Sequence, residues 1–153
     1  MARTLRLWAM AVLFAVMAGA PMARAAGIVP VVFHTADGRR LAYRMELEQS
    51  EAELAHGLMG RREVPPQTGM LFDFGYARPI SMWMKDTPIP LDMVFIAEDG
   101  RILSIAARTV PLSLAIIPSP GPVRAVIELA GGTCEHEGIR VGDRVGAALF
   151  GTH

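Results

Sequence analysis

Residues 69–95 constrain the fold of this chain more than any other stretch. Two runs in it, residues 80–85 and 91–96, have the β-branched and apolar composition of strands. Between them stands Asp-Thr-Pro-Ile-Pro, in which Pro88 and Pro90 fix φ and have no N–H to donate to a sheet. The two runs are therefore predicted to form a central hairpin whose connection is a stiff loop.

The rest of the chain consists of short apolar runs separated by turn signals. Asp-Gly pairs at residues 37–38 and 99–100 are typical of hairpin turns. The further predicted strands are residues 28–34, 40–47, 70–74, 101–107, 123–129 and 145–150, and residues 108–122, with four prolines, are predicted to be a long, partly ordered surface loop.

Two helices are predicted, and both are short. Ser50 with Glu53 three positions later forms a capping-box pattern, and Gly57 should end that helix in left-handed geometry. Thr133 is expected to cap a single helical turn that ends at Gly138. Many short strands with one or two small helices indicate a mainly β, compact single domain, either a sandwich or a barrel-like sheet.

The first 25 residues have the pattern of a secretory signal peptide. Arg3 and Arg6 precede an uncharged run over residues 7–22, and Ala-Arg-Ala at 23–25 is a small-x-small cleavage site. A retained membrane anchor is the alternative, but the run of 16 residues is shorter than the roughly 20 that span a bilayer. The predicted mature chain, residues 26–153, is thus exported to the periplasm or the extracellular space, without stable membrane insertion.

Loss of the leader leaves 12 basic against 15 acidic residues, a net charge of about −3. This balance gives no long-range attraction for nucleic acid or anionic lipid, so neither is an expected partner. Cys134, the single cysteine, is expected to be a buried bystander; the alternatives are a reactive thiol or a ligand beside His136. Cys134-Glu135-His136 offers too few ligands for a closed zinc site, and no cofactor motif is present.

A polar group concentrated near the predicted central loop is the candidate functional site. An aromatic wall with a few directed polar groups is the usual composition of a small-molecule site. We therefore expect a binding module for a small molecule, a glycan or a peptide, with its groove at the loop end of the hairpin. The candidate ligand-binding residues are Arg61, Trp83, Lys85, Asp86, Thr87 and Asp92.

The alternative is a hydrolase, in which Asp92 or Asp86 acts as general base while Lys85 or Arg61 stabilises negative charge. No nucleophile elbow, phosphate loop or His-Glu-x-x-His pattern supports it. A purely structural interpretation also fits these residues. Trp83 would then pack at the rim beneath Lys85, more than half buried, and Asp92 would accept hydrogen bonds from N–H groups of the proline-containing loop.

Five ordered motifs closely resemble the DUF192 family, a bacterial and archaeal domain of unknown function. They are Gly-Leu-Met-Gly-Arg at 57–61, Gly-Met-Leu-Phe at 69–72, Trp-Met-Lys-Asp-Thr-Pro-Ile-Pro-Leu-Asp at 83–92, Asp-Gly-Arg-Ile at 99–102 and Gly-Ile-Arg-Val-Gly-Asp-Arg-Val at 138–145. The resemblance covers residues 29–149. It implies a compact, mostly β, sandwich-like domain that is often exported, and no established activity. Asp86 stands where the family usually has asparagine.

Overall fold

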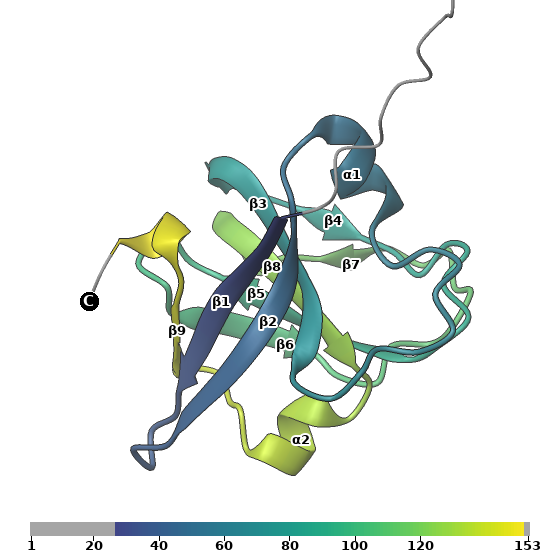
Figure 1. The fold of residues 1–153 in the computed structure, drawn as a ribbon. Coiled ribbons are helices and arrows are strands. Elements are labelled where there is room, and N and C mark those ends of the chain that lie inside the picture. The colour runs from purple at the N-terminus through teal and green to yellow at the C-terminus, as the bar shows by residue number, and fades with distance from the viewer. Residues whose placement is uncertain (1–26, 152–153) are drawn as a thin grey trace, which may run out of the picture.

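A seven-stranded sheet forms the body of the computed structural model, which describes residues 27–151 (Figure 1). The predicted signal peptide lies outside the described residues. Within the sheet the order of the strands is β6-β5-β8-β3-β2-β1-β9. Their bounds are β1 Gly27–His34, β2 Arg40–Glu48, β3 Thr68–Arg78, β5 Leu91–Ile96, β6 Ile102–Ala106, β8 Val123–Ala130 and β9 Arg144–Gly146. All pairings are antiparallel except that of β2 with β3, which is parallel.

The sheet curls until its two edges almost meet. Next to the edge strand β6, Arg101 forms an isolated antiparallel bridge with Arg144 of β9. The backbone N–H of Ile102 donates to the carbonyl of Asp143 at 2.8 Å, and the N–H of Val145 donates to the carbonyl of Gly100 at 2.7 Å. These bonds satisfy edge groups that would otherwise be unpaired. The mainly β fold that the sequence predicted is confirmed, and of the two predicted forms, a sandwich or a barrel-like sheet, the structure has the barrel-like sheet.

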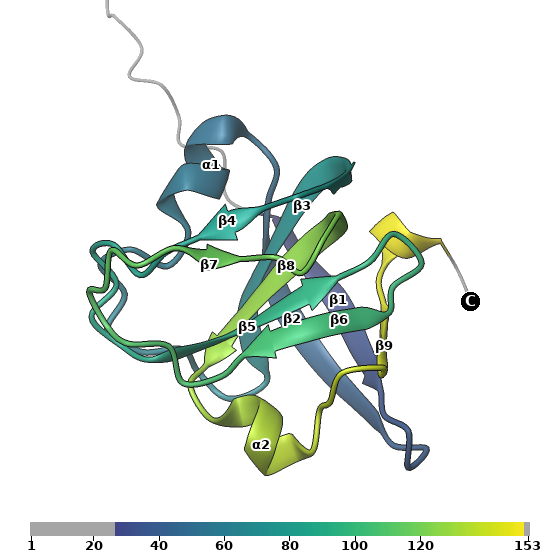
Figure 2. The same cartoon turned by 180° about the vertical axis from the view of Figure 1, so that it is seen from behind.

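Two apolar clusters lie on the two faces of this sheet. The inner cluster fills the barrel and includes Phe33, Met45 and Ile127. The outer cluster includes Phe72 of β3, Phe95 of β5 and Val126 of β8, and its cover comes from short elements that pack against the outside of these strands. The covering elements are α1 Glu51–His56, β4 Ser81–Met82 and β7 Ile117–Pro118 (Figure 2).

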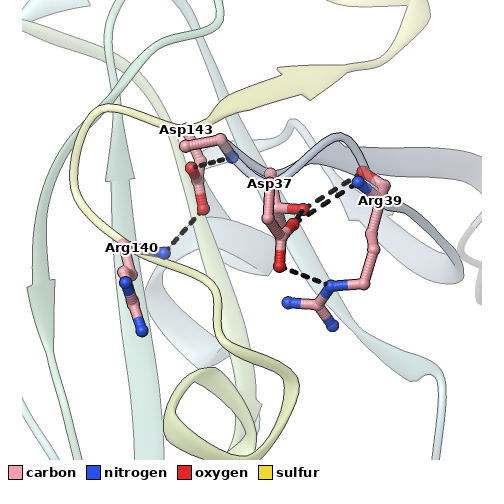
Figure 3. Close-up of polar contacts among 6 residues, drawn as sticks. Asp37, Arg39, Arg140 and Asp143 are labelled. Carbon is pink, nitrogen blue, oxygen red and sulfur yellow. Dashed lines mark hydrogen bonds and ion pairs between the residues drawn. The ribbon is translucent and has the colours of Figure 1, made fainter.

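Helix α2 Thr133–Glu137 lies at one end of the barrel, where buried Cys134 and Ile139 join the inner cluster (Figure 1). The loop that follows is tied to the β1–β2 turn by the buried carboxylate of Asp143. This carboxylate accepts hydrogen bonds from the backbone N–H of Ala36 at 2.9 Å and of Arg140 at 2.8 Å (Figure 3). Because one carboxylate joins segments 107 positions apart, it fixes the end of the barrel.

The local predictions for turns and for the first helix are confirmed. β1 and β2 form a hairpin around Gly38, and β5 and β6 form one around Gly100. The capping box at Ser50 and Glu53 is present, although Gly57 ends α1 with φ 50° and ψ −137° rather than in left-handed helical geometry. Both devices depend on neighbouring residues alone, which is why the sequence reveals them.

Three predicted boundaries are wrong. The strand predicted at 70–74 extends to Arg78, with a register shift between Asp73 and Arg78 and with Gly75 at φ 80°. The predicted last strand ends at Gly146 and is followed by the 3₁₀ turn η1 Ala148–Phe150. The N-cap of α2 is Gly132 rather than Thr133, and no side chain caps this helix. Within the predicted loop 108–122, residues 117–118 form β7.

Candidate functional site

The predicted central hairpin does not form. β4, only two residues long, pairs with β7, so that Met82 lies opposite Ile117. β5 instead lies between β6 and β8, and all six of its residues are buried. The two faces of β5 pack in the two apolar clusters, whereas β4, before the prolines, belongs to a separate two-stranded sheet. Sequence alternation alone could not identify these long-range partners.

The loop between β4 and β5 is fixed by its own turn and by the long loop beside it. Asp86 adopts φ 53°, a conformation that Asp and Asn tolerate better than most residues. The backbone N–H of Thr87 donates to the carbonyl of Met84 at 3.1 Å. The N–H of Leu112 donates to the carbonyl of Thr87 at 3.0 Å, and the N–H of Met84 to that of Ser113 at 3.0 Å. Residues 83–87 are therefore held in place from two sides.

A pocket of about 240 Å³ opens between this loop, helix α1 and the outer face of the sheet. Most of its wall is apolar. Trp83 contributes an aromatic wall and is 44% exposed, so just over half of it is covered. The side chains and backbone around the pocket belong to Leu54, Ala55, His56, Gly57, Leu58, Met59, Phe72, Ser81, Met82, Trp83, Thr87 and Glu128.

Glu128 is the one acidic residue that lines this pocket. It lies on β8, between Met70 of β3 and Met93 of β5, and is 4% exposed. Its Oε2 has no hydrogen-bond partner among residues 27–151. Burial raises the pKa of this carboxyl to about 8, and the nearby backbone N–H of Leu58 lowers that pKa only in part. A buried polar atom without a partner is rare in folded proteins and requires an explanation.

The backbone beside Glu128 leaves room at the unpaired oxygen. Gly57 ends α1 with φ 50°, and a Cβ at this position would lie 3.6 Å from Oε2 of Glu128 and 3.0 Å from Cζ of Phe72. Glycine at position 57 thus allows the positive φ of the turn, and its lack of a Cβ leaves space beside Oε2 of Glu128. Our sequence analysis did not single out Glu128. The available signal was one carboxylate inside the apolar run 125–130 of a strand predicted to be buried.

Two of the predicted site residues, Trp83 and Thr87, line the pocket. Thr87 is buried, and its hydroxyl donates to the carbonyl of Lys85 at 3.1 Å. Lys85 Nζ lies 5.4 Å from the centroid of the Trp83 ring, a cation–π contact at the rim. Arg61 pairs with Glu46 at 2.6 Å, and the carbonyl of Asp86 accepts the N–H of Gly60 at 2.8 Å. Neither Arg61 nor Asp86 lines the pocket.

Asp92 is fully buried and lies apart from the other predicted residues. Its carboxylate accepts three backbone N–H groups, from Arg108 at 2.8 Å, Gly132 at 2.9 Å and Cys134 at 2.8 Å. The predicted acceptor role is present, but the donors come from the loop after β6 and from the start of α2. The loop that contains Pro88 and Pro90, which we expected to supply them, contributes none of these three bonds.

A family model, described as uncharacterized ACR, matches residues 32–147. The chain belongs to the DUF192 family. Two crystal structures resemble this DUF192 domain. One, from Sinorhizobium meliloti 1021, has a name that proposes a transcription regulator; it is 45% identical, with a TM-score of 0.80 over 82% of this chain and 98% of its own. The other, from Novosphingobium aromaticivorans DSM 12444, is described as a protein of unknown function. It is 40% identical, with a TM-score of 0.75 over 78% and 84%. No curated protein matches the chain.

The DUF192 domain contains a second hollow, of about 910 Å³, at β1, β9 and the C-terminal turn. Its charged side chains are exposed, and Arg144 pairs with Asp99 at 3.6 Å. It is larger than the pocket at Glu128, but no buried polar atom without a partner lines it among residues 27–151. The unpaired buried oxygen of Glu128 therefore makes the smaller pocket the better candidate for a binding site. Its lining consists of Val32, His34, Arg40, Asp99, Arg144, Val145, Gly146, Ala147, Ala148, Phe150 and Gly151.

Other reactive groups in the described part of this DUF192 chain are few. No three His, Cys, Asp or Glu side chains in residues 27–151 are grouped so that they could hold a metal ion. The thiol of Cys134 is buried, and burial together with the neighbouring Asp92 raises its pKa, so the thiol stays protonated at neutral pH. No helix in the same range is long and apolar enough to cross a membrane.

Proposed function

We propose that this DUF192 domain is an exported binding module, and that its ligand enters the pocket bounded by Trp83, Thr87 and Glu128. The observation that carries the proposal is the Oε2 atom of Glu128, which is buried and has no partner among the described residues. Leaving such an atom unpaired costs about 1 to 3 kcal/mol. A donor on a ligand would remove that cost, which gives the pocket a physical reason to bind one.

The size of the pocket limits what can enter it. Sites for drug-sized ligands usually measure about 300 to 1,000 Å³, whereas this one measures about 240 Å³. A small molecule would fit whole, and a glycan or a peptide would insert a single group. Apolar walls from Leu58, Phe72 and Trp83 favour a ligand whose inserted part is mostly hydrocarbon.

A hydrolase would need a carboxylate and a cation converging on one open volume. Asp92 is buried and already accepts three N–H groups, while Lys85 and Arg61 contact Trp83 and Glu46. We therefore do not propose the hydrolase. Nor do we propose the role of a transcription regulator, which the name of the Sinorhizobium structure carries, because the net charge of about −3 of the predicted mature chain gives no attraction for nucleic acid.

Export is part of the proposal and rests on the sequence pattern of residues 1–25. Intact-mass analysis of protein recovered outside the cytoplasm tests it directly. We expect a chain that begins at Ala26. A mass that retains residues 1–25 would contradict cleavage.

A fragment screen tests the pocket. We would record methionine-methyl NMR spectra of the protein with a library of small fragments, since Met59 and Met82 line the pocket and Met45 lies inside the barrel. Fragments that bind should change the methyl chemical shifts of Met59 and Met82 and leave the methyl chemical shift of Met45 unchanged. Glu128→Gln should change the set of hits, whereas Glu63→Gln, at an exposed position, should not. If no fragment in the library changes the methyl chemical shift of Met59 or Met82, the proposed function is rejected.

A further inference from the structure

The proposed pocket has the chemistry of a site for one particular kind of group, and the inference drawn here rests on that proposed function. We infer that the pocket receives a protonated primary amine at the end of a short apolar chain, with the ammonium at the carboxylate of Glu128 and the chain against Trp83, Leu58 and Phe72.

Oε2 of Glu128 is buried without a hydrogen-bond partner among the described residues. None of the ion pairs among residues 27–151 includes it, and no side chain donates to its Oε2. Two of the predicted site residues that carry a positive charge are engaged elsewhere, since Lys85 lies over the ring of Trp83 and Arg61 pairs with Glu46. A buried carboxylate is stable only when a cation or several donors face it. An ammonium supplies both a charge and three N–H donors.

The second step concerns the walls. Around Glu128 the pocket presents the side chains of Leu54, Leu58 and Phe72, which suit hydrocarbon. The Trp83 ring already attracts one cation, Lys85, at its rim. The rest of its surface in the pocket is apolar and suits the hydrocarbon chain of the ligand. A ligand with a carboxylate at its end would bring two acids together, so it could bind only while Glu128 kept its proton.

The third step is the protonation state of the site. In the free protein the carboxyl of Glu128, with its pKa near 8, keeps its proton at neutral pH. Binding an ammonium favours the ionised carboxylate, so each binding event releases one proton from Glu128. The other ionisable side chain that lines the pocket is His56 on α1, and Lys85 and Asp86 lie in the adjoining loop. None of these three exerts a charge effect on the Glu128 pKa.

Linkage then fixes the sign of the pH dependence. Amine affinity should rise more than tenfold between pH 6 and pH 8, because the proton leaves Glu128 more easily as the pH approaches its pKa. Aliphatic amines keep their charge throughout this range, since their pKa lies near that of lysine, about 10.4. A carboxylate ligand that needs the proton of Glu128 would show the opposite trend and would weaken as the pH rises.

The test compares three probes of equal chain length, hexylamine, hexanol and hexanoate. Binding is followed through the methyl signals of Met59 and Met82 in the full chain at pH 6, 7 and 8. We expect hexylamine to bind with an affinity that rises across this range and falls at least tenfold in Glu128→Gln. Hexanol should bind the wild type and Glu128→Gln alike, and Glu63→Gln should behave as wild type.

Two results would overturn the inference and leave the binding function standing. In the first, hexanol or hexanoate changes the methyl chemical shifts of Met59 and Met82, but hexylamine does not. The other is hexylamine binding that weakens from pH 6 to pH 8. If Glu128→Gln fails to fold, the pH series on the wild type decides alone. If none of the three probes moves either methyl group, the ammonium is rejected, and the fragment screen decides separately whether the pocket binds anything.

Discussion

Asp92 and Glu128 lie on neighbouring strands, but their side chains point to opposite faces of the sheet. Asp92 pairs with Leu129, a member of the inner cluster, whereas Glu128 pairs with Met93 of the outer cluster. Strand alternation therefore directs one carboxylate to the end of the barrel and the other to the pocket. Three backbone N–H groups bind Asp92, and none of the described groups binds Oε2 of Glu128. We infer that the first carboxylate is structural and the second functional.

Replacing Asp92 should destabilise the fold. In Asp92→Asn the amide NH₂ would face backbone N–H donors that now share a carboxylate, so buried N–H groups of Arg108, Gly132 or Cys134 would lose their acceptor. We expect a loss of about 1.5 to 3 kcal/mol in the free energy of unfolding. Urea denaturation measures it. Lys85→Ala, at an exposed position, is the control and should change that free energy by about 0.5 kcal/mol or less. Equal effects of the two substitutions would contradict the structural role.

Glu128 should make the protein less stable as the pH rises from about 4.5 to about 8. Burial raises its pKa in the folded protein to about 8, above the ordinary value of 4.5 for a glutamate. Between these two values the folded state holds a proton that the unfolded chain has released, so the free energy of unfolding decreases with pH. We would measure urea denaturation at pH 5, 6, 7 and 8 in the wild type and in Glu128→Gln. As the pH rises, the variant should become steadily more stable relative to the wild type. A difference in the free energy of unfolding that stays constant with pH would show that the carboxyl titrates normally.

Gly69 should not tolerate a side chain. A Cβ at this position would collide with the backbone carbonyl of Glu128 and approach both Met45 Sδ and Leu129 Cδ2 to 3.0 Å. Gly69→Ala would force β3 away from β8 and should cost about 1 to 3 kcal/mol. Gly121→Ala is the matched control, because its Cβ would meet nothing within 4 Å. Thermal unfolding of both variants checks this, and equal melting temperatures would contradict the close approach.

Trp83 should report on the pocket. In a Trp8→Phe background its fluorescence arises from a single ring that lines the pocket and is 44% exposed. Hexylamine should shift the emission, and Trp83→Leu should weaken hexylamine binding by about threefold to tenfold, because the hydrocarbon chain loses the ring against which it packs. Leu114→Ala, on the exposed loop, should not affect binding. An emission spectrum that hexylamine leaves unchanged would argue against contact between the ligand and this ring.

The sequence predicts the parts of this fold that depend on near neighbours. Asp-Gly turns at Gly38 and Gly100 and the capping box at Ser50 are present because each is complete within a few residues. The parallel pairing of β2 with β3 and the pairing of β4 with β7 depend on contacts across the whole fold. Alternation cannot specify those partners, which is why the predicted central hairpin was wrong.

The candidate site was found only in part for the same reason. Trp83 and Thr87 stood out as an aromatic and a polar residue beside two prolines, and both line the pocket. Glu128 lies 41 positions beyond Thr87, on β8, and the pairing of β8 with both β3 and β5 brings it there. Its importance lies in a missing partner, and the absence of a contact cannot be read from sequence. Asp92 was correctly expected to accept N–H groups, but their source depended on the tertiary fold.

Carbon-13 NMR titration of the Glu128 carboxyl tests the central claim most directly. In the free protein the carboxyl should titrate with a pKa near 8, and Glu63, an exposed residue, serves as an internal reference. Saturation with hexylamine should lower the Glu128 midpoint well below that value, because the bound ammonium favours the carboxylate. A midpoint near 4.5 that is the same with and without hexylamine would contradict both the unpaired carboxyl and its proposed ligand.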